Sequence, residues 1–281
     1  MKYKINKDSI EIFEANTFDP ESILASGQIF HFGCENDIWW VNVGDKRAEI
    51  HTLSNNNYKI YTQYPKFFEN YFDFSTNYDM ILTRLGKYEI LNPALTYSKG
   101  VRLLRQPLIE VIINFIISAN NNIPRIRKSV QAICTNFGKK TDWGYAFPTI
   151  QELSKITEQD FINFGCGYRS SYLTQTIKVL QDENFLNSLK QVSSTEEARK
   201  ILLSLKGVGP KVADCILLFG LQRFDVFPVD TWIHKVYADE FGGKENNRTK
   251  ISQSLVNTFG QDSGYCQQYL FYYKRKEIKL K

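Results

Sequence analysis

Short runs of β-branched and aromatic residues alternate with turn-forming residues through the first ninety or so positions. Four runs, separated by Gly, Asp and Asn, are predicted to be strands, at 10–14, 38–43, 48–53 and 58–62. Short strands joined by turns favour an antiparallel sheet. One short helix is predicted at Asp19-Pro20-Glu21, because this triplet offers a cap, a first-turn proline and an acidic group at the positive end of the helix dipole.

From about residue 100 the apolar residues recur with the period of a helix. Three helices are predicted: one from Pro107 to a stop at 120–122, one from Pro124 to Gly138, and one from a capping box at Ser194 to Gly207. Their apolar stripes are typical of helices that face a core. The pattern therefore predicts an α+β protein, with an N-terminal antiparallel β-sheet domain over 1–99 followed by a helical bundle domain over 100–281.

The composition excludes several classes of protein. The 281 residues, of which 43% are hydrophobic and 23% charged, suffice for about two domains or one large one, without low-complexity sequence. No apolar stretch approaches the roughly 18–20 residues of a membrane span, and no apolar run follows the charged N-terminus as in a secretory signal. We therefore expect no membrane association.

Charge and cysteine content say little about a partner or a metal. The net charge is +5, but residues 274–281 hold five cations and one anion and so supply +4 of it, which leaves nucleic-acid binding open. The five cysteines are scattered and form no C-x-x-C pair, which argues against a zinc or iron–sulfur site and fits free thiols in a reducing compartment. Three histidines leave little scope for an imidazole metal centre.

The most informative stretch is a glycine-containing turn, Leu-Lys-Gly-Val-Gly-Pro-Lys-Val-Ala-Asp-Cys, at 205–215. One helix would end at Gly207 and the next would begin at Pro210, so that two helices meet through a hairpin. Backbone N–H groups at such a helix N-terminus can bind a phosphate without a strongly basic surface. A plain helix–helix corner has the same pattern, so both interpretations remain open at this point.

Lys211 and Asp230 are candidates for chemistry. The helix dipole disfavours a cation in the first turn, where Lys211 would lie, and an uncharged lysine amine is a nucleophile. Asp230 precedes a helical run and is a natural N-cap, a role that needs no catalysis. Close to Lys211, however, an ionised Asp230 could also stabilise a positively charged, sugar-like transition state.

Together these motifs resemble a known family. The 205–215 stretch followed by Val-Phe-Pro-Val-Asp at 226–230 resembles the helix-hairpin-helix (about 198–220), Gly/Pro-rich loop and Asp signature of the DNA glycosylase superfamily, and Lys211 is typical of its bifunctional members. Further stretches resemble the 8-oxoguanine DNA glycosylase family in particular, namely 26–30, 101–106, 120–125 and 167–169. The resemblance involves both halves of the chain.

The resemblance implies a bifunctional DNA glycosylase/AP lyase of base excision repair. Its partner would be double-stranded DNA that contains an oxidised purine, from which the damaged nucleotide is extruded. Lys211 would attack the sugar C1′, expel the base and form a Schiff base that leads to β-elimination, with Asp230 as the second catalytic residue. We expect a monomer without a required cofactor, in the cytoplasm or nucleoid of a prokaryote or the nucleus of a eukaryote.

The resemblance also implies three sets of binding residues. The base pocket would be formed by Gly27, Cys215, Gln267 and Phe271. The gap in the duplex and the orphaned cytosine would be contacted by Asn120, Arg125, Tyr168 and Arg169. DNA phosphate would be held at Gly207, Val208, Gly209 and Trp232, and a structural Na⁺ or K⁺ ion by the carbonyls of Leu203, Leu205 and Val208. Trp232 is a departure, since many relatives have histidine there.

The chemistry of the base explains why such positions suit the lesion. 8-Oxoguanine carries an N7–H donor where guanine has an acceptor, so a backbone carbonyl could accept from the lesion and repel the normal base, and the resemblance implies that this carbonyl is that of Gly27. Arginine donors suit the acceptor edge of cytosine, so Arg125 and Arg169 predict a preference for cytosine opposite the lesion. Taken singly, Gly27 could be a turn glycine and Phe271 a core residue.

Two alternatives remain, of which the first belongs to a different class of protein and the second is a glycosylase with another substrate. A non-catalytic DNA-binding module could keep the hairpin for phosphate contact alone, but it would not need Lys211 paired with Asp230. A glycosylase for alkylated or mismatched bases would not need Gly27, Gln267 and Phe271 together.

Overall fold

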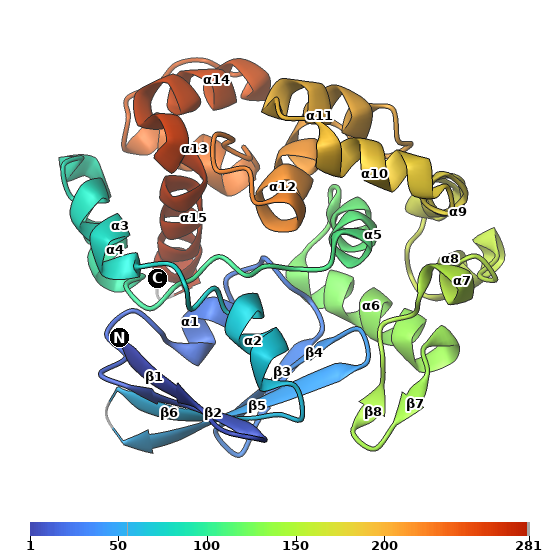
Figure 1. Cartoon of the computed structure of the whole chain (residues 1–281). Coiled ribbons are helices and arrows are strands. Elements are labelled where there is room, and N and C mark those ends of the chain that lie inside the picture. The colour runs from blue at the N-terminus through green and yellow to red at the C-terminus, as the bar shows by residue number, and fades with distance from the viewer. Residues whose placement is uncertain (55, 280–281) are drawn as a thin grey trace.

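A six-stranded antiparallel sheet forms one layer of the protein, and helices form a second layer on one side of it (Figure 1). The structure is a computed structural model that describes residues 1–54 and 56–279, with side chains to 276. In sheet order the strands are β1 (Lys2–Ile5), β2 (Ser9–Phe13), β6 (Asn57–Tyr61), β5 (Lys46–Ser54), β4 (Ile38–Val43) and β3 (Phe32–Glu35). The predicted α+β class and the four predicted strands are confirmed.

Strands β1 and β3 were not predicted, and each is only four residues long. In β1, lysines alternate with Tyr3 and Ile5, and the strand is largely exposed at the sheet edge. In β3, Gly33 interrupts the apolar run. The Trp40 indole of β4 packs directly on Gly33, where a Cβ atom would lie 2.4 Å from Trp40 Cζ2. The glycine is therefore required by cross-strand packing, which a single strand's sequence does not reveal.

Residues 65–97 form short helices joined by turns, so the prediction of strands and turns alone was wrong for this part of the first ninety residues. They form α2 (Pro65–Tyr71), α3 (Tyr78–Leu85), the 3-10 helix η1 (Glu89–Leu91) and α4 (Asn92–Tyr97). These helices are shorter than three turns, and they are rich in aromatic residues, which are also common in strands. Their N-termini nevertheless carry helix-start signals: Asn77 caps α3, and a proline lies in the first turn of α2 and of α4.

The helical half begins before residue 100, contrary to the predicted boundary. Tyr78, Leu85 and Leu91 belong to the same hydrophobic cluster as the helices that follow. A second cluster joins the sheet to α1 (Pro20–Leu24) and α2. Asp19 caps α1 by accepting the Ser22 amide, as predicted from the Asp-Pro-Glu triplet.

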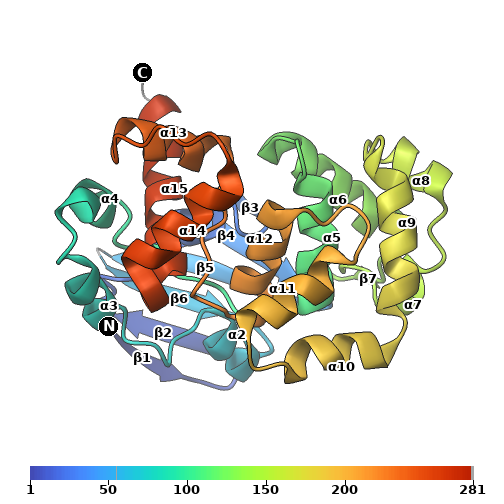
Figure 2. The same ribbon diagram turned by 90° about the horizontal axis from the view of Figure 1, so that it is seen from above.

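The remaining helices form a layer around a central pair. In chain order they are α5 (Leu108–Ser118), α6 (Ile123–Phe137), α7 (Ile150–Leu153), α8 (Glu158–Asn163), α9 (Arg169–Leu180), α10 (Glu183–Gln191), α11 (Thr195–Leu203), α12 (Pro210–Leu221), α13 (Thr231–Asp239), α14 (Arg248–Phe259), the 3-10 helix η2 (Gly260–Asp262) and α15 (Ser263–Lys279). A hairpin of β7 (Lys140–Thr141) and β8 (Gly144–Tyr145) follows α6. Helix α12 lies beside α5 near the centre of the layer, as Figure 2 shows from above.

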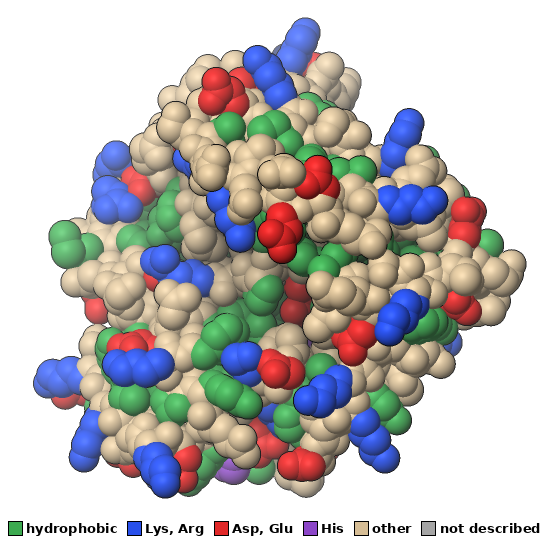
Figure 3. Space-filling model, turned by 45° about the vertical axis from the view of Figure 1, so that its right-hand side comes forward, with side chains coloured by type: hydrophobic (Ala, Val, Ile, Leu, Met, Phe, Trp, Pro, Cys, Tyr) green, Lys and Arg blue, Asp and Glu red, His purple; other side chains and the backbone are tan. Residues whose placement is uncertain are grey.

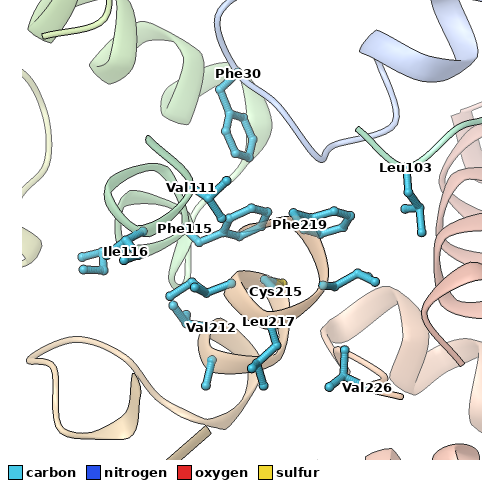
Figure 4. Close-up of a cluster of buried hydrophobic side chains, with 14 of the residues drawn as sticks. Phe30, Leu103, Val111, Phe115, Ile116, Val212, Cys215, Leu217, Phe219 and Val226 are labelled. Carbon is cyan, nitrogen blue, oxygen red and sulfur yellow. The ribbon is translucent and has the colours of Figure 1, made fainter. Parts of the chain in front are cut away.

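Aromatic packing joins α5 to α12. The rings of Phe115 and Phe219 stack with centroids 5.4 Å apart and planes inclined by 10° (Figure 4).

Within the described residues no helix is long and apolar enough to cross a membrane.

Helix α11 ends four residues earlier than predicted, at Leu203 rather than at Gly207. Its last turn tightens, since the amides of Ser204 and Leu205 donate to carbonyls three residues back. Gly207 instead lies in the hairpin with φ +81°, and a Cβ there would lie 2.8 Å from the Tyr172 side chain. The glycine therefore serves the turn and its close approach to α9, not the helix end.

The buried Arg102 side chain makes hydrogen bonds and a ring contact where the two hydrophobic clusters meet. Its side chain is 1% exposed, and its guanidinium donates to the carbonyls of Phe72, Thr17 and Asp73 at 2.9, 3.0 and 2.6 Å. The guanidinium also lies 3.9 Å from the ring centroid of Tyr78. The three carbonyls lie beside the sheet-side cluster, which contains Phe18, Phe72 and Phe74, whereas the Tyr78 ring belongs to the helical cluster, so one side chain contacts both.

Replacing Arg102 by Met should lower the free energy of unfolding by about 3–5 kcal/mol, because the buried carbonyls lose their donors. Urea denaturation measures the change. Lys66→Met is the matched control, since Lys66 is 80% exposed and its ion pair with Glu69 should contribute less than about 0.5 kcal/mol. Equal unfolding midpoints for the two variants would contradict the role given to Arg102.

Candidate active site

Two connected cavities lie where the sheet layer meets the helices. The larger, called here the outer groove, has a volume of about 1070 Å³ and is lined by residues that include Trp39, Asn121, Arg127, Trp232 and Arg275. The smaller, called the inner pocket, has a volume of about 40 Å³ and is lined by residues of α5, α12 and α15 and by the loops that carry Gly27 and Asp230. Both cavities are lined by Gly27, Phe115, Lys211, Asp230 and Phe271.

Charged side chains of one sign do not gather in a single patch on the face of the protein shown in Figure 3. On the face shown in Figure 3, basic and acidic side chains are interspersed, with hydrophobic ones between them near a central hollow. The distribution agrees with the weak electrostatic signal of the sequence. Binding of an anionic partner would therefore depend on particular contacts rather than on a broad positive field.

Lys211 lies in the first turn of α12, where the hairpin turns its backbone into the helix. Gly209 is the N-cap and Pro210 the first helical residue, as predicted. The half-buried Lys211 side chain lines both cavities, and its Nζ lies 5.4 Å from the ring centroid of Phe115 on α5. The amine thus faces the junction of the two cavities and lies against the Phe115 ring.

Asp230 lies at the same junction, at the start of α13. Its Oδ1 accepts the amides of both Trp232 and Ile233 at 2.9 Å, so the predicted N-cap is present. The cap does not use Oδ2. The residue can therefore cap the helix with one oxygen and present the other to the cavities that Lys211 also lines.

The four predicted base-pocket residues all line the inner pocket, namely Gly27, Cys215, Gln267 and Phe271. Gln267 is 5% exposed, and its Oε1 has no hydrogen-bond partner among the described residues. Gly27 has φ +85°, and a Cβ there would lie 2.9 Å from Phe271 Cε1. The pocket therefore contains a free buried acceptor and a backbone position that has no room for a side chain.

The predicted gap-filling residues come together on two adjacent loops. Arg169 is 7% exposed and donates to the carbonyls of Ala119 (2.6 Å), Asn120 (2.7 Å) and Cys166 (3.2 Å). The Tyr168 hydroxyl reaches the Ala119 carbonyl at 3.4 Å, while most of its side chain is exposed. In this structure Arg169 organises the loop, and its contact with a cytosine stays a prediction.

Asn120 and Arg125 are exposed on the other side of that loop. Asn120 has φ +48°, a conformation that asparagine tolerates better than most residues. Asn122 caps α6 by accepting the Arg125 amide at 3.0 Å, which fixes the start of the helix that carries Arg125. Asn121 and Asn122 also line the outer groove, so this loop forms part of its rim.

The hairpin presents fewer free amides than predicted. The Val208 amide donates to the Leu205 carbonyl at 3.2 Å, which closes the turn, so it is not available to a phosphate in this conformation. The Gly207 and Gly209 amides have no such partner within the described part of the chain. The Leu205 carbonyl, one of three predicted to hold a cation, thus already accepts one hydrogen bond.

Two family models match adjacent parts of this chain, which together span residues 10–260. The model described as "8-oxoguanine DNA glycosylase, N-terminal domain" matches residues 10–112, and the one described as "HhH-GPD superfamily base excision DNA repair protein" matches 113–260. The chain belongs to the 8-oxoguanine DNA glycosylase family. The predicted family and the class of enzyme are thereby confirmed.

Individual relatives agree with this assignment. The chain is 35% identical to N-glycosylase/DNA lyase OGG1 of Arabidopsis thaliana over 62% of its own length, although the match spans only 52% of that relative. It is also 35% identical to the N-glycosylase/DNA lyase of Saccharomyces cerevisiae, over 69% of this chain and 67% of the relative. The structure resembles Clostridium acetobutylicum 8-oxoguanine glycosylase/lyase bound to dsDNA containing cytosine opposite 8-oxoG, with a TM-score of 0.93, 32% identity and 99% of each chain covered.

Sequence reasoning missed three residues of this family member's site. Gln28 lay in a quoted motif without a role, yet it is fully buried and positions the Gly27 loop. Phe115 was assigned to an apolar stripe but also lines both cavities, and Arg275 was counted as part of a basic tail. A polar residue inside an apolar run could have identified Gln28, whereas only tertiary contacts reveal the other two.

Cys215 shares the pocket with Lys211 and is the other potential nucleophile there. The thiol is 3% exposed, and burial raises its pKa to about 11, although the nearby Lys211 amine acts in the opposite direction. At pH 8 only about one thiol in a thousand would be ionised. Since the thiolate is the reactive form, this environment favours the amine over the thiol as nucleophile.

Iodoacetamide should modify the exposed Cys34 of the native protein and leave Cys215 unmodified between about pH 7 and pH 9. Within that range the Cys215 thiol stays protonated, because its pKa lies above it. Peptide mass spectrometry at timed intervals measures both rates. Modification of Cys215 as fast as Cys34 would restore the thiol as a candidate nucleophile.

Proposed function

We propose that this protein is a bifunctional DNA glycosylase/AP lyase that extrudes 8-oxoguanine from duplex DNA and excises it, preferentially opposite cytosine. The observation that carries the proposal is that a lysine, a carboxylate and the four residues expected to recognise the base line one pocket. The residues concerned are Gly27, Lys211, Cys215, Asp230, Gln267 and Phe271.

The chemistry starts with the amine at the cavity junction. Lys211 Nζ bonds to the sugar C1′ as the C1′–N9 bond breaks, and the base leaves with the proton that the amine loses. Opening of the sugar ring gives a Schiff base, loss of a C2′ proton then expels the 3′ phosphate, and hydrolysis frees the lysine. Asp230 stabilises the positive charge that develops at the sugar, with the oxygen that does not cap α13.

Recognition of the base uses hydrogen-bond acceptors at the inner pocket. The Gly27 carbonyl accepts N7–H of the lesion, and Gln267 Oε1, which lacks a partner among the described side chains, accepts from the Watson–Crick edge. Phe271 and Cys215 lie against the two faces of the ring. The inner pocket of about 40 Å³ has room for a few waters but not for a purine, so lesion entry requires its walls to separate.

Duplex contacts come from the rim and the hairpin. The exposed Asn120, Arg125 and Tyr168 occupy the gap left by the extruded nucleotide, and arginine donors pair with the acceptor edge of the opposite cytosine. The Gly207 and Gly209 amides hold backbone phosphate at the positive end of α12.

We also propose that a monovalent cation binds the hairpin, through the carbonyls of Leu203, Leu205 and Val208. A carbonyl oxygen has two lone pairs, so Leu205 can serve a cation while it accepts the Val208 amide. Such an ion would rigidify the turn that presents the Gly207 and Gly209 amides.

Lys211→Gln should abolish the covalent complex that borohydride traps between the protein and an 8-oxoguanine duplex. Because the amine is the nucleophile, single-turnover base release should fall on the order of 10³-fold or more, while binding to the lesion duplex is largely retained. Lys200→Gln is the matched control, since Lys200 is exposed on α11 and lines neither cavity.

Three results would contradict the proposal in different ways. Unimpaired base release by the Lys211 variant would remove the nucleophile. Tight duplex binding by the wild type without any trapping would favour a non-catalytic DNA-binding protein. Release of alkylated or mismatched bases in preference to 8-oxoguanine would reassign the substrate.

Gly27→Ala should slow excision of 8-oxoguanine opposite cytosine by about 10-fold or more, because the new methyl group occupies the space of Phe271 at the base pocket. Gly44→Ala is the matched control: its φ of +54° imposes similar backbone strain, of about 1 kcal/mol, but nothing lies within 4 Å of its Cβ position. Single-turnover excision and thermal melting separate the two effects. Equal excision rates for the two variants would remove Gly27 from the pocket.

A further inference from the structure

Arg275 is a buried cation beside the proposed active site. It lies one turn after Phe271 on α15, and its guanidinium is 5.5 Å from the centroid of that ring. The residue is only 8% exposed. It lines the outer groove together with Lys211 and Asp230, but it does not line the inner pocket.

The guanidinium has hydrogen-bond donors to spare. Nη2 donates to the Ala25 carbonyl, whereas Nε and Nη1 are buried without a partner among the described residues. Burial lowers the pKa of Arg275, and Asp230 is the carboxylate that acts against this effect. Buried donors are almost always satisfied in native proteins, so a fixed cation with free N–H groups at a cavity indicates an acceptor that arrives with the ligand.

The lining residues give the direction in which a base would lie. Gln267 lines only the inner pocket and Arg275 only the outer groove, whereas Lys211 lines both. A purine with its Watson–Crick edge at Gln267 and its glycosidic N9 at Lys211 has C8, the neighbour of N9, at the junction. Arg275 Nη1 lies there, 3.0 Å from the position that a Cβ of Gly27 would take.

We propose that Arg275 donates a hydrogen bond to the C8 oxygen of extruded 8-oxoguanine. Guanine has C8–H at this position, so only the lesion satisfies the guanidinium, and the normal base would leave a buried cation unpaired. This contact complements the one to N7–H. The Gly27 carbonyl accepts from the N7–H donor, and Arg275 donates to the adjacent C8 oxygen. This inference rests on the proposed function.

The test compares two reactions of one variant. Arg275→Met keeps an unbranched apolar stem at this position but removes every donor. Single-turnover release of 8-oxoguanine should slow by about 10–100-fold. Cleavage of a duplex that carries a ready-made abasic site should stay within about 2-fold of the wild type, because no base is present to be recognised. Arg275→Lys, which keeps one donor, should restore part of the loss.

Lys276→Met is the matched control. Lys276 follows Arg275 on α15 and pairs with Glu21, and it lines neither cavity. Both reactions should be unchanged in this variant. Melting temperatures of all three variants establish that they fold.

A substrate change on the wild type provides an independent test should Arg275→Met fail to fold. 8-Thioguanine retains N7–H but replaces the C8 oxygen by sulfur, a weaker acceptor. The wild type should release it about 10-fold or more slowly than 8-oxoguanine, and this preference should shrink in Arg275→Lys.

Four outcomes would overturn the inference. Equal loss on the lesion and abasic duplexes would place Arg275 on the DNA backbone or on Lys211. Unchanged release of 8-oxoguanine by Arg275→Met would show that the C8 oxygen is not contacted, as would equal release of the oxygen and sulfur bases by the wild type. A wild type that cleaves abasic sites but releases no 8-oxoguanine would refute the proposed substrate, and the Arg275 contact with it.

Discussion

The site depends on one buried amide, that of Gln28. This side chain is fully buried: Nε2 donates to the carbonyls of Ile23 (3.2 Å) and Arg102 (2.8 Å), and Oε1 accepts the Leu104 amide at 2.9 Å. From the other side, Gln268 of α15 donates to the Ser26 carbonyl at 3.3 Å. The loop that carries Gly27 is therefore held between the 102–104 segment and α15. Without this network, a pocket wall from the first thirty residues could not keep its register with a nucleophile near residue 211.

Helix starts position the reactive groups on the opposite wall. Lys211 lies in the first turn of α12 and Asp230 caps α13, so backbone geometry fixes both with little help from other side chains. Stacked Phe115 and Phe219 keep α5 against α12 beneath the amine. The same arrangement places the positive ends of two helices near the site of an anionic ligand. A modest overall charge is therefore compatible with DNA binding.

Local sequence signals predict many of the helices and strands of this protein. They do not predict features that depend on tertiary packing. Caps and first-turn prolines located α1, α5 and α6, and the family resemblance identified the pocket residues. The short helices between 65 and 97 were not predicted, because they are too short for a clear helical period. Arg275 was missed for a different reason: in sequence it belongs to a run of basic residues, and only the fold turns it inward against Phe271 and the Ala25 carbonyl.

The Asn120 loop and the hairpin already have a fixed conformation without DNA, whereas the inner pocket would have to change to admit a base. Arg169 already holds the Asn120 loop through three carbonyls, and the Val208 amide already closes the hairpin, so the duplex meets preformed loops. The inner pocket, at about 40 Å³, is too small for a purine. If the proposed function holds, discrimination between bases occurs as the pocket widens, since only a base that satisfies the free groups lining it can offset the cost of separating its walls. This favours a protein that binds undamaged duplex readily and commits only when the correct base enters.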